Sequence, residues 1–126
     1  PNEDDLRQAQ ASGFATMTGL IEQRPPIPTS FDLIVCAQTA DHWVDPLAAL
    51  RWLRASLAPQ GRLYLDIVDA RRWRARQPLH AFKIDHPLYW TPPSLRRALA
   101  LTGWAIRRSY GSLNRLRWSV ICEGVN

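Results

Sequence analysis

Apolar residues form two kinds of pattern along this chain, and together they predict a sheet flanked by helices. Near-continuous apolar runs occupy residues 31–36 and 62–68, which is typical of parallel strands buried on both faces. Between them, Asp45 and Pro46 suit the cap and first position of a helix. Its apolar face repeats at helical spacing, through Leu47, Leu50, Leu53 and Leu57. A turn at residues 59–61 then returns the chain to the second strand.

The C-terminal third of the pattern predicts a helix followed by two antiparallel strands. Thr91 can cap a helix with Pro92 at its first position, and Gly103 can end that helix. Residues 104–110 and 115–123 are then strands, joined by a turn at residues 111–114.

Earlier segments are less regular. A helix from Glu3, capped by Asn2 and stopped by Gly13, precedes a candidate strand at residues 14–18. Three prolines make residues 23–30 a loop, and residues 69–90 are predicted to hold a short helix or a lid. The alternation of strands and helices predicts one α/β domain over residues 1–126.

Composition narrows the class of protein. The chain has 126 residues, 46% of them apolar, which supports a packed core. No apolar run approaches the roughly 20 residues that cross a bilayer, and the acidic start does not resemble a signal peptide, so we expect a cytoplasmic protein that does not enter a membrane. Cys36 and Cys122 lie in separate apolar runs and are expected to be buried free thiols.

The net charge of +5 raises the question of an anionic partner. Residues 71–76 combine four arginines with Trp73, a pattern that suits phosphate contacts and stacking, so a nucleic-acid-binding module is one alternative. No helix-turn-helix, zinc or RNA-recognition motif accompanies it, and the remaining arginines are scattered; nucleic acid is therefore not the partner we expect. His80, Asp85 and His86 match no familiar metal-ligand spacing, so no metal is predicted.

Four short motifs occur in an order that resembles the class I S-adenosylmethionine-dependent methyltransferases. Residues 31–35 (FDLIV) resemble that family's fourth strand, and residues 41–46 (DHWVDP) the segment that follows it. Residues 57–63 (LAPQGRL) resemble its turn into the fifth strand. Residues 89–95 (YWTPPSL) with 101–104 (LTGW) resemble the helix and strand after that.

The resemblance implies a partial class I methyltransferase (Rossmann-like) sheet, mostly parallel with an antiparallel last strand. It implies S-adenosyl-L-methionine as cofactor and a small molecule as methyl acceptor. Ligands of such sheets lie at the carboxyl ends of the strands. The residues implied in cofactor binding are Gly19, Leu20, Ile21, Ala37, Gln38 and Thr39.

His42 lies near the same strand ends and is our candidate general base, with backbone hydrogen bonding at the helix start as its alternative role. Trp43, Tyr89 and Trp90 are candidate substrate contacts, with core packing as the alternative for each.

The sequence departs from the family pattern at the cofactor. None of its six glycines forms a G-x-G cluster, so we expect a fragment of a longer enzyme, with a noncatalytic methyltransferase-like protein as an alternative. The family's strands that would flank residues 31–36 have no counterpart in the sequence. That strand should therefore have an open apolar edge, covered by a homodimer contact or by residues 14–18 in a new position.

Overall fold

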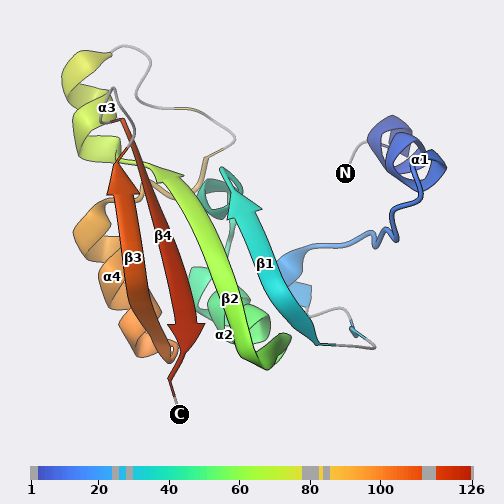
Figure 1. Cartoon of the computed structure of the whole chain (residues 1–126). Coiled ribbons are helices and arrows are strands. Elements are labelled where there is room, and N and C mark those ends of the chain that lie inside the picture. Colours follow the sequence, from blue (N-terminus) through green and yellow to red (C-terminus); the bar gives the residue numbers. More distant parts are fainter. Residues whose placement is uncertain are drawn as a thin grey trace.

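The computed structural model describes residues 3–23, 26–27, 30–77, 83, 86–111 and 116–125 (Figure 1). The elements are, in chain order, α1 (Glu3–Ala11), η1 (Ile21–Gln23), β1 (Phe31–Ala37), η2 (Ala40–His42), α2 (Pro46–Ala55), β2 (Leu57–Val68), α3 (Ala70–Arg76), α4 (Pro92–Leu101), β3 (Trp104–Gly111) and β4 (Arg117–Gly124). Within those described ranges, no helix is long and apolar enough to cross a bilayer.

The four strands form one mixed sheet in the order β1-β2-β4-β3. β1 and β2 are parallel, and β4 is antiparallel to both β2 and β3. Three strands therefore run one way and β4 runs against them, which confirms the α/β class and the antiparallel last strand. Because β4 lies between β2 and β3, two of the three pairings are antiparallel, so by pairing the sheet is mixed rather than mostly parallel.

The core lies between one face of the sheet and the helices α2 and α4, which both cover that face in Figure 1. Side chains alternate across the pleat of β2, so that Leu63, Leu65 and Ile67 all point into the core and are fully buried. Leu50 of α2 and Leu99 of α4 meet them from the helical side. This packing is what holds the strand ends, and therefore the site, in place.

β1 is an edge strand whose second face is open. Leu33 and Val35 are 59% and 58% exposed, and no strand of the described chain pairs with the outer edge of β1. The prediction that residues 31–36 are buried on both faces is therefore wrong, whereas the prediction of an open apolar edge is confirmed.

Residues 14–18 do not form the predicted strand. Phe14 is 69% exposed and no described strand pairs with this segment, so its apolar side chains have no sheet to join. α1 forms as predicted and ends before Gly13, whose φ of +84° suits a glycine stop. The helix contributes no buried residue, and Figure 1 shows it standing away from the sheet.

The passage from α2 to β2 also differs from the prediction. The helix ends at Ala55, and Leu57 already pairs with Phe31 of β1 instead of extending the helical face. The turn expected at residues 59–61 lies inside β2, where the register with β1 shifts between Phe31 and Leu33. Gly61 is required there, because a Cβ atom would lie 2.7 Å from the carbonyl oxygen of Phe31.

Candidate functional site

The carboxyl ends of β1 and β2 meet at one edge of the sheet, where the predicted site begins. Gln38 follows β1 with a φ of +54°, a left-handed conformation that costs a residue with a Cβ atom about 1 kcal/mol. Its backbone N–H donates to the carbonyl oxygen of Asp66 at 3.1 Å. This bond ties the reversal to β2 and leaves Ala37, Gln38 and Thr39 exposed at the sheet edge.

The thiol beneath this turn is inert by environment. Burial raises the pKa of Cys36 to about 11, and a hydrogen bond from the Thr39 side chain opposes the rise only in part. Burial likewise raises the pKa of Cys122 to about 12. The prediction of two buried free thiols is confirmed.

Two long-range bonds fix η2, the short helix that carries His42. The indole Nε1 of Trp90 donates to the carbonyl oxygen of Ala40 at 3.0 Å, and the backbone N–H of Leu88 donates to that of Asp41 at 3.2 Å. The imidazole of His42 is held at the surface, in edge-to-face contact with His86 at a centroid distance of 4.6 Å.

Asp41 is the buried charge of this site. Its side chain is 4% exposed, and desolvation raises the pKa of its carboxyl above the ordinary value. Electrostatic interactions with His86, His42 and Lys83 oppose that rise in the pKa of Asp41, and the interaction with Asp66 adds to it. The site therefore combines a buried carboxyl group of raised pKa with two imidazole rings.

The predicted aromatic contacts fall into two groups. Trp43 and Trp90 are buried in the core, so their rings pack beneath the site and are not exposed on its surface. Tyr89 is half-buried, and its hydroxyl both accepts from the backbone N–H of Lys83 at 2.8 Å and donates to the carbonyl oxygen of the same residue at 3.0 Å.

The segment containing Gly19, Leu20 and Ile21 approaches the site at the start of α2. Glu22 accepts a hydrogen bond from the backbone N–H of Val44 at 2.9 Å, and Ile21 packs against the core. Leu20 is left 56% exposed. The Glu22–Val44 bond thus joins the residue after Ile21 to a residue two positions after His42.

Metal ligands are not gathered in the described ranges, where no group of three or more His, Cys, Asp or Glu side chains could hold an ion. His80 and Asp85, two of the three residues weighed as ligands, lie outside the described residues. The third, His86, contacts the rings of His42 and Trp73.

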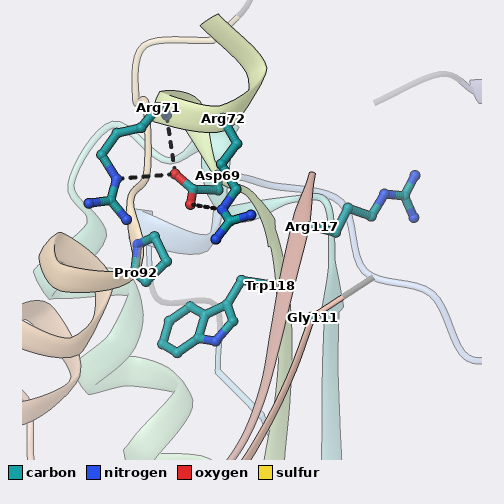
Figure 2. A pocket seen from close by; sticks show the side chains of 7 residues that line it. All are labelled: Asp69, Arg71, Arg72, Pro92, Gly111, Arg117 and Trp118. Carbon is teal, nitrogen blue, oxygen red and sulfur yellow. Dashed lines mark hydrogen bonds and ion pairs between the residues drawn. The ribbon is translucent and has the colours of Figure 1, made fainter. Parts of the chain in front are cut away.

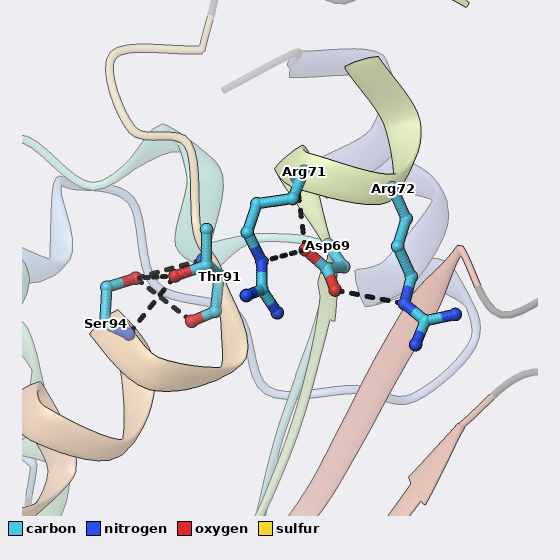
Figure 3. Close-up of polar contacts among 5 residues, drawn as sticks. All are labelled: Asp69, Arg71, Arg72, Thr91 and Ser94. Carbon is cyan, nitrogen blue, oxygen red and sulfur yellow. Dashed lines mark hydrogen bonds and ion pairs between the residues drawn. The ribbon is translucent and has the colours of Figure 1, made fainter. Parts of the chain in front are cut away.

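A cavity of about 350 Å³ lies where β2 runs into α3, at the carboxyl end of β2 (Figure 2). Its lining comes from four separate elements and their junctions: Asp69, Arg71, Arg72, Pro92, Gly111, Arg117 and Trp118. Asp69 caps α3 through its bond from the backbone N–H of Arg71, at 3.1 Å. Thr91 and Ser94 cap α4 beside it in a reciprocal pair (Figure 3).

The arginines of this cavity gave a signal in the sequence. They stood out as part of the basic run at residues 71–76, with Trp73 as the expected stacking partner. Trp73 instead donates from Nε1 to the side chain of Gln77 at 3.1 Å, and the indole near the arginines is Trp118. A partner so distant in the chain is brought in by the pairing of β4 with β2, which local pattern does not reveal.

Comparison with protein families gives a match over most of the chain. A family model described as a methyltransferase domain matches residues 2–109. Among curated proteins, the chain is similar to the tRNA U34 carboxymethyltransferase of Campylobacter curvus (strain 525.92), with 29% identity over 92 residues. That alignment covers 71% of this chain and 30% of the relative, so the chain spans less than a third of the relative's length.

Solved structures show the same likeness in three dimensions. An S-adenosylmethionine-dependent methyltransferase from Clostridium acetobutylicum ATCC 824 matches with a TM-score of 0.75 and 12% identity, covering 95% of this chain and 69% of that one. An O-methyltransferase from neocarzinostatin biosynthesis, in complex with S-adenosylmethionine and 2-hydroxy-5-methyl naphthoic acid, matches with a TM-score of 0.73 and 14% identity. The second match covers 99% of this chain and 39% of that one. At these identities the likeness concerns the fold.

Proposed function

The chain belongs to the methyltransferase domain family, and on this premise we propose that it takes part in transferring a methyl group from S-adenosylmethionine to a small molecule. The observation that carries the proposal is the left-handed turn at Gln38, which leaves residues 37–39 exposed at the carboxyl end of β1. Ligands of open α/β sheets bind at that edge.

We infer that residues 19–21 and the turn at Gln38 together suit a nucleoside with a polar tail. Leu20 is exposed and Ile21 half-buried, which gives an apolar surface for a flat base. Gln38 and Thr39 offer amide and hydroxyl groups for the polar end. We therefore assign the cofactor to Gly19, Leu20, Ile21, Ala37, Gln38 and Thr39; when bound, S-adenosylmethionine supplies an electrophilic methyl group.

His42 is the proposed general base. Its imidazole is exposed beside the turn, and imidazole is a common proton acceptor near neutral pH. Trp43, Tyr89 and Trp90 would border the methyl acceptor, with Tyr89 the most accessible of the three. Most of the rate would come from alignment of the two reactants, and His42 would matter only for an acceptor that must lose a proton.

Calorimetric titration with S-adenosylmethionine tests the cofactor assignment, on this chain and on any longer product of the same gene. Leu20→Asp should weaken binding by about tenfold or more, because it places a charge against the base. Leu101→Asp is the matched control, since Leu101 is equally exposed at 58% and lies on α4. Absence of binding in every chain would refute the proposal and favour a noncatalytic protein.

His42→Gln tests the proposed base separately. We expect cofactor affinity to be unchanged and methyl transfer to an acceptor that must lose a proton to fall, because the variant lacks the proton-accepting imidazole. A variant that transfers methyl groups to such an acceptor as fast as the wild type does would remove His42 from the mechanism.

A nucleic-acid acceptor is the second candidate. The similar protein from Campylobacter curvus is named for its action on tRNA, and Arg74 and Arg76 of α3 are exposed. Binding of oligonucleotides that weakens steeply with salt would favour this candidate over a small molecule.

We also propose that the open edge of β1 pairs with a second copy of the chain. Unpaired strand edges with exposed apolar side chains favour such pairing. Leu33→Lys should then shift the sedimentation coefficient from dimer to monomer, because a lysine on the edge strand opposes pairing. A wild-type chain that sediments as a monomer at high concentration would refute the dimer.

A further inference from the structure

The cavity at the β2–α3 junction contains guanidinium groups whose hydrogen-bond donors are only partly engaged by the described residues. Asp69 is 2% exposed; it accepts a hydrogen bond from Nε of Arg71 at 3.4 Å and forms an ion pair with Nε of Arg72 at 3.4 Å. Both contacts engage Nε, and within the described chain the Nη atoms of these two guanidinium groups make no hydrogen bond or ion pair. One carboxylate faces two guanidinium groups, so the cavity retains a net positive charge.

The side chains of Arg71 and Arg72 converge on Asp69 and do not form an extended row of positive charge. Figure 2 shows Arg71 and Arg72 on either side of Asp69, above Pro92 and Trp118. Arg117 also borders the cavity, but its guanidinium points away in Figure 2 and approaches Asp66 at 3.8 Å. Arg74 and Arg76, on the same helix, do not line it. A single small anion matches this geometry better than a long polyanion.

Trp118 provides a flat apolar floor. Its ring is half-buried against the core, and the guanidinium of Arg96 covers it at 4.9 Å from the centroid. Trp90 and Trp104 donate from Nε1 to backbone carbonyls, but Trp118 donates to no described residue. The indole of Trp118 offers an aromatic surface and an Nε1–H donor, and the Nη groups of Arg71 and Arg72 offer further donors. This combination suits a ligand ring that carries an oxyanion.

We propose that this cavity binds a small molecule in which a carboxylate or phosphate is attached to a flat ring. The oxyanion would accept from the Nη groups of Arg71 and Arg72, and the ring would lie between Trp118 and Pro92. A volume of about 350 Å³ is at the lower end of the range of small-ligand pockets. The site goes beyond the proposed methyl transfer and does not depend on it.

Titration calorimetry with phenyl phosphate and with benzoate tests the proposal, with inorganic phosphate and phenol as the part-ligands. We expect the ring-bearing anions to bind more tightly than inorganic phosphate and phenol to bind least. Arg71→Gln and Arg72→Gln should each weaken phenyl phosphate by about tenfold or more, since a charge-assisted hydrogen bond is lost. Arg76→Gln, on the same helix but outside the cavity, should bind as the wild type does.

Trp118→Leu tests the ring contact, because it replaces the flat indole with an apolar side chain that has no ring. It should reduce the affinity for phenyl phosphate toward that for inorganic phosphate, while circular dichroism reports that the fold is kept. No saturable binding of either ring-bearing anion in the millimolar range would overturn the proposal. So would equal losses in Arg76→Gln and Arg71→Gln. Tighter binding of oligonucleotides, lost in the same arginine variants, would assign the cavity to nucleic acid and also overturn it.

Discussion

Two buried tryptophans join helices and loops to the core through their indole nitrogens, and only one of them supports the site. Trp90 donates to the carbonyl oxygen of Ala40 at 3.0 Å, in η2 beside His42. Trp104 donates to that of Leu50 at 3.1 Å, in the middle of α2. The rings are 6% and 3% exposed, so phenylalanine at either position removes a comparable buried hydrogen bond.

The expected loss can be worked from these contacts. Leaving a buried acceptor unpaired costs about 1–3 kcal/mol. The carbonyl oxygen of Ala40 keeps a second donor, the backbone N–H of Trp43 at 3.4 Å, and that of Leu50 keeps its backbone donor within α2. The cost at each carbonyl should therefore lie in the lower half of that range. The smaller ring leaves a partial cavity that adds about 1 kcal/mol. Each variant should therefore lower the free energy of unfolding by about 2–3 kcal/mol.

Urea denaturation followed by far-ultraviolet circular dichroism measures both losses, and the slope with urea should stay constant. Only Trp90→Phe should also shift the NMR signals of the His42 imidazole, because η2 loses its anchor. A Trp90→Phe variant as stable as the wild type, beside a destabilised Trp104→Phe, would refute the anchoring of η2 by the indole. Shifted His42 signals in both variants would show that the effect is not local.

Three further outcomes follow from the same contacts. Burial raises the pKa of Asp41 in the native state, so the free energy of unfolding of the wild type should fall as the pH rises from the ordinary value of 3.8 through the native pKa. Urea denaturation at several pH values should show that Asp41→Asn lacks this fall. Cys36 and Cys122, with pKa values raised to about 11 and about 12, should react with a disulfide reagent at pH 8 only after unfolding, and fast labelling of the native chain would contradict their burial. Thr91→Ala should cost about 1 kcal/mol in the same urea assay through the lost cap of α4, and no change would mean that the cap is not formed.

Much of the fold could be predicted because its signals are local. The apolar run at residues 31–36 predicts β1, and Thr91 with Pro92 predicts the start of α4, since a cap and an apolar period act within a few residues. The methyltransferase-like arrangement expected from the ordered motifs is confirmed by the family match and the solved structures.

The errors arise where distant parts of the chain decide the local structure. Leu57 continues the helical period of α2, but pairing with Phe31 draws it into β2. Residues 14–18 have the composition of a strand but no neighbour to pair with. For the same reason the site was predicted only in part: residues 37–42 follow directly from the end of a strand, whereas Trp118 reaches Arg71 only through the antiparallel pairing of β4 with β2.

The position of β4 has a consequence for how the chain is made. β4 follows the other three described strands in chain order but occupies the interior of the sheet, between β2 and β3. On a ribosome, the emerging chain would present β3 and the inner edge of β2 without their shared neighbour until residues 117–124 leave the exit tunnel. During synthesis those two edges are open to chaperones or to other nascent chains, so the sheet should close only after β4 has emerged.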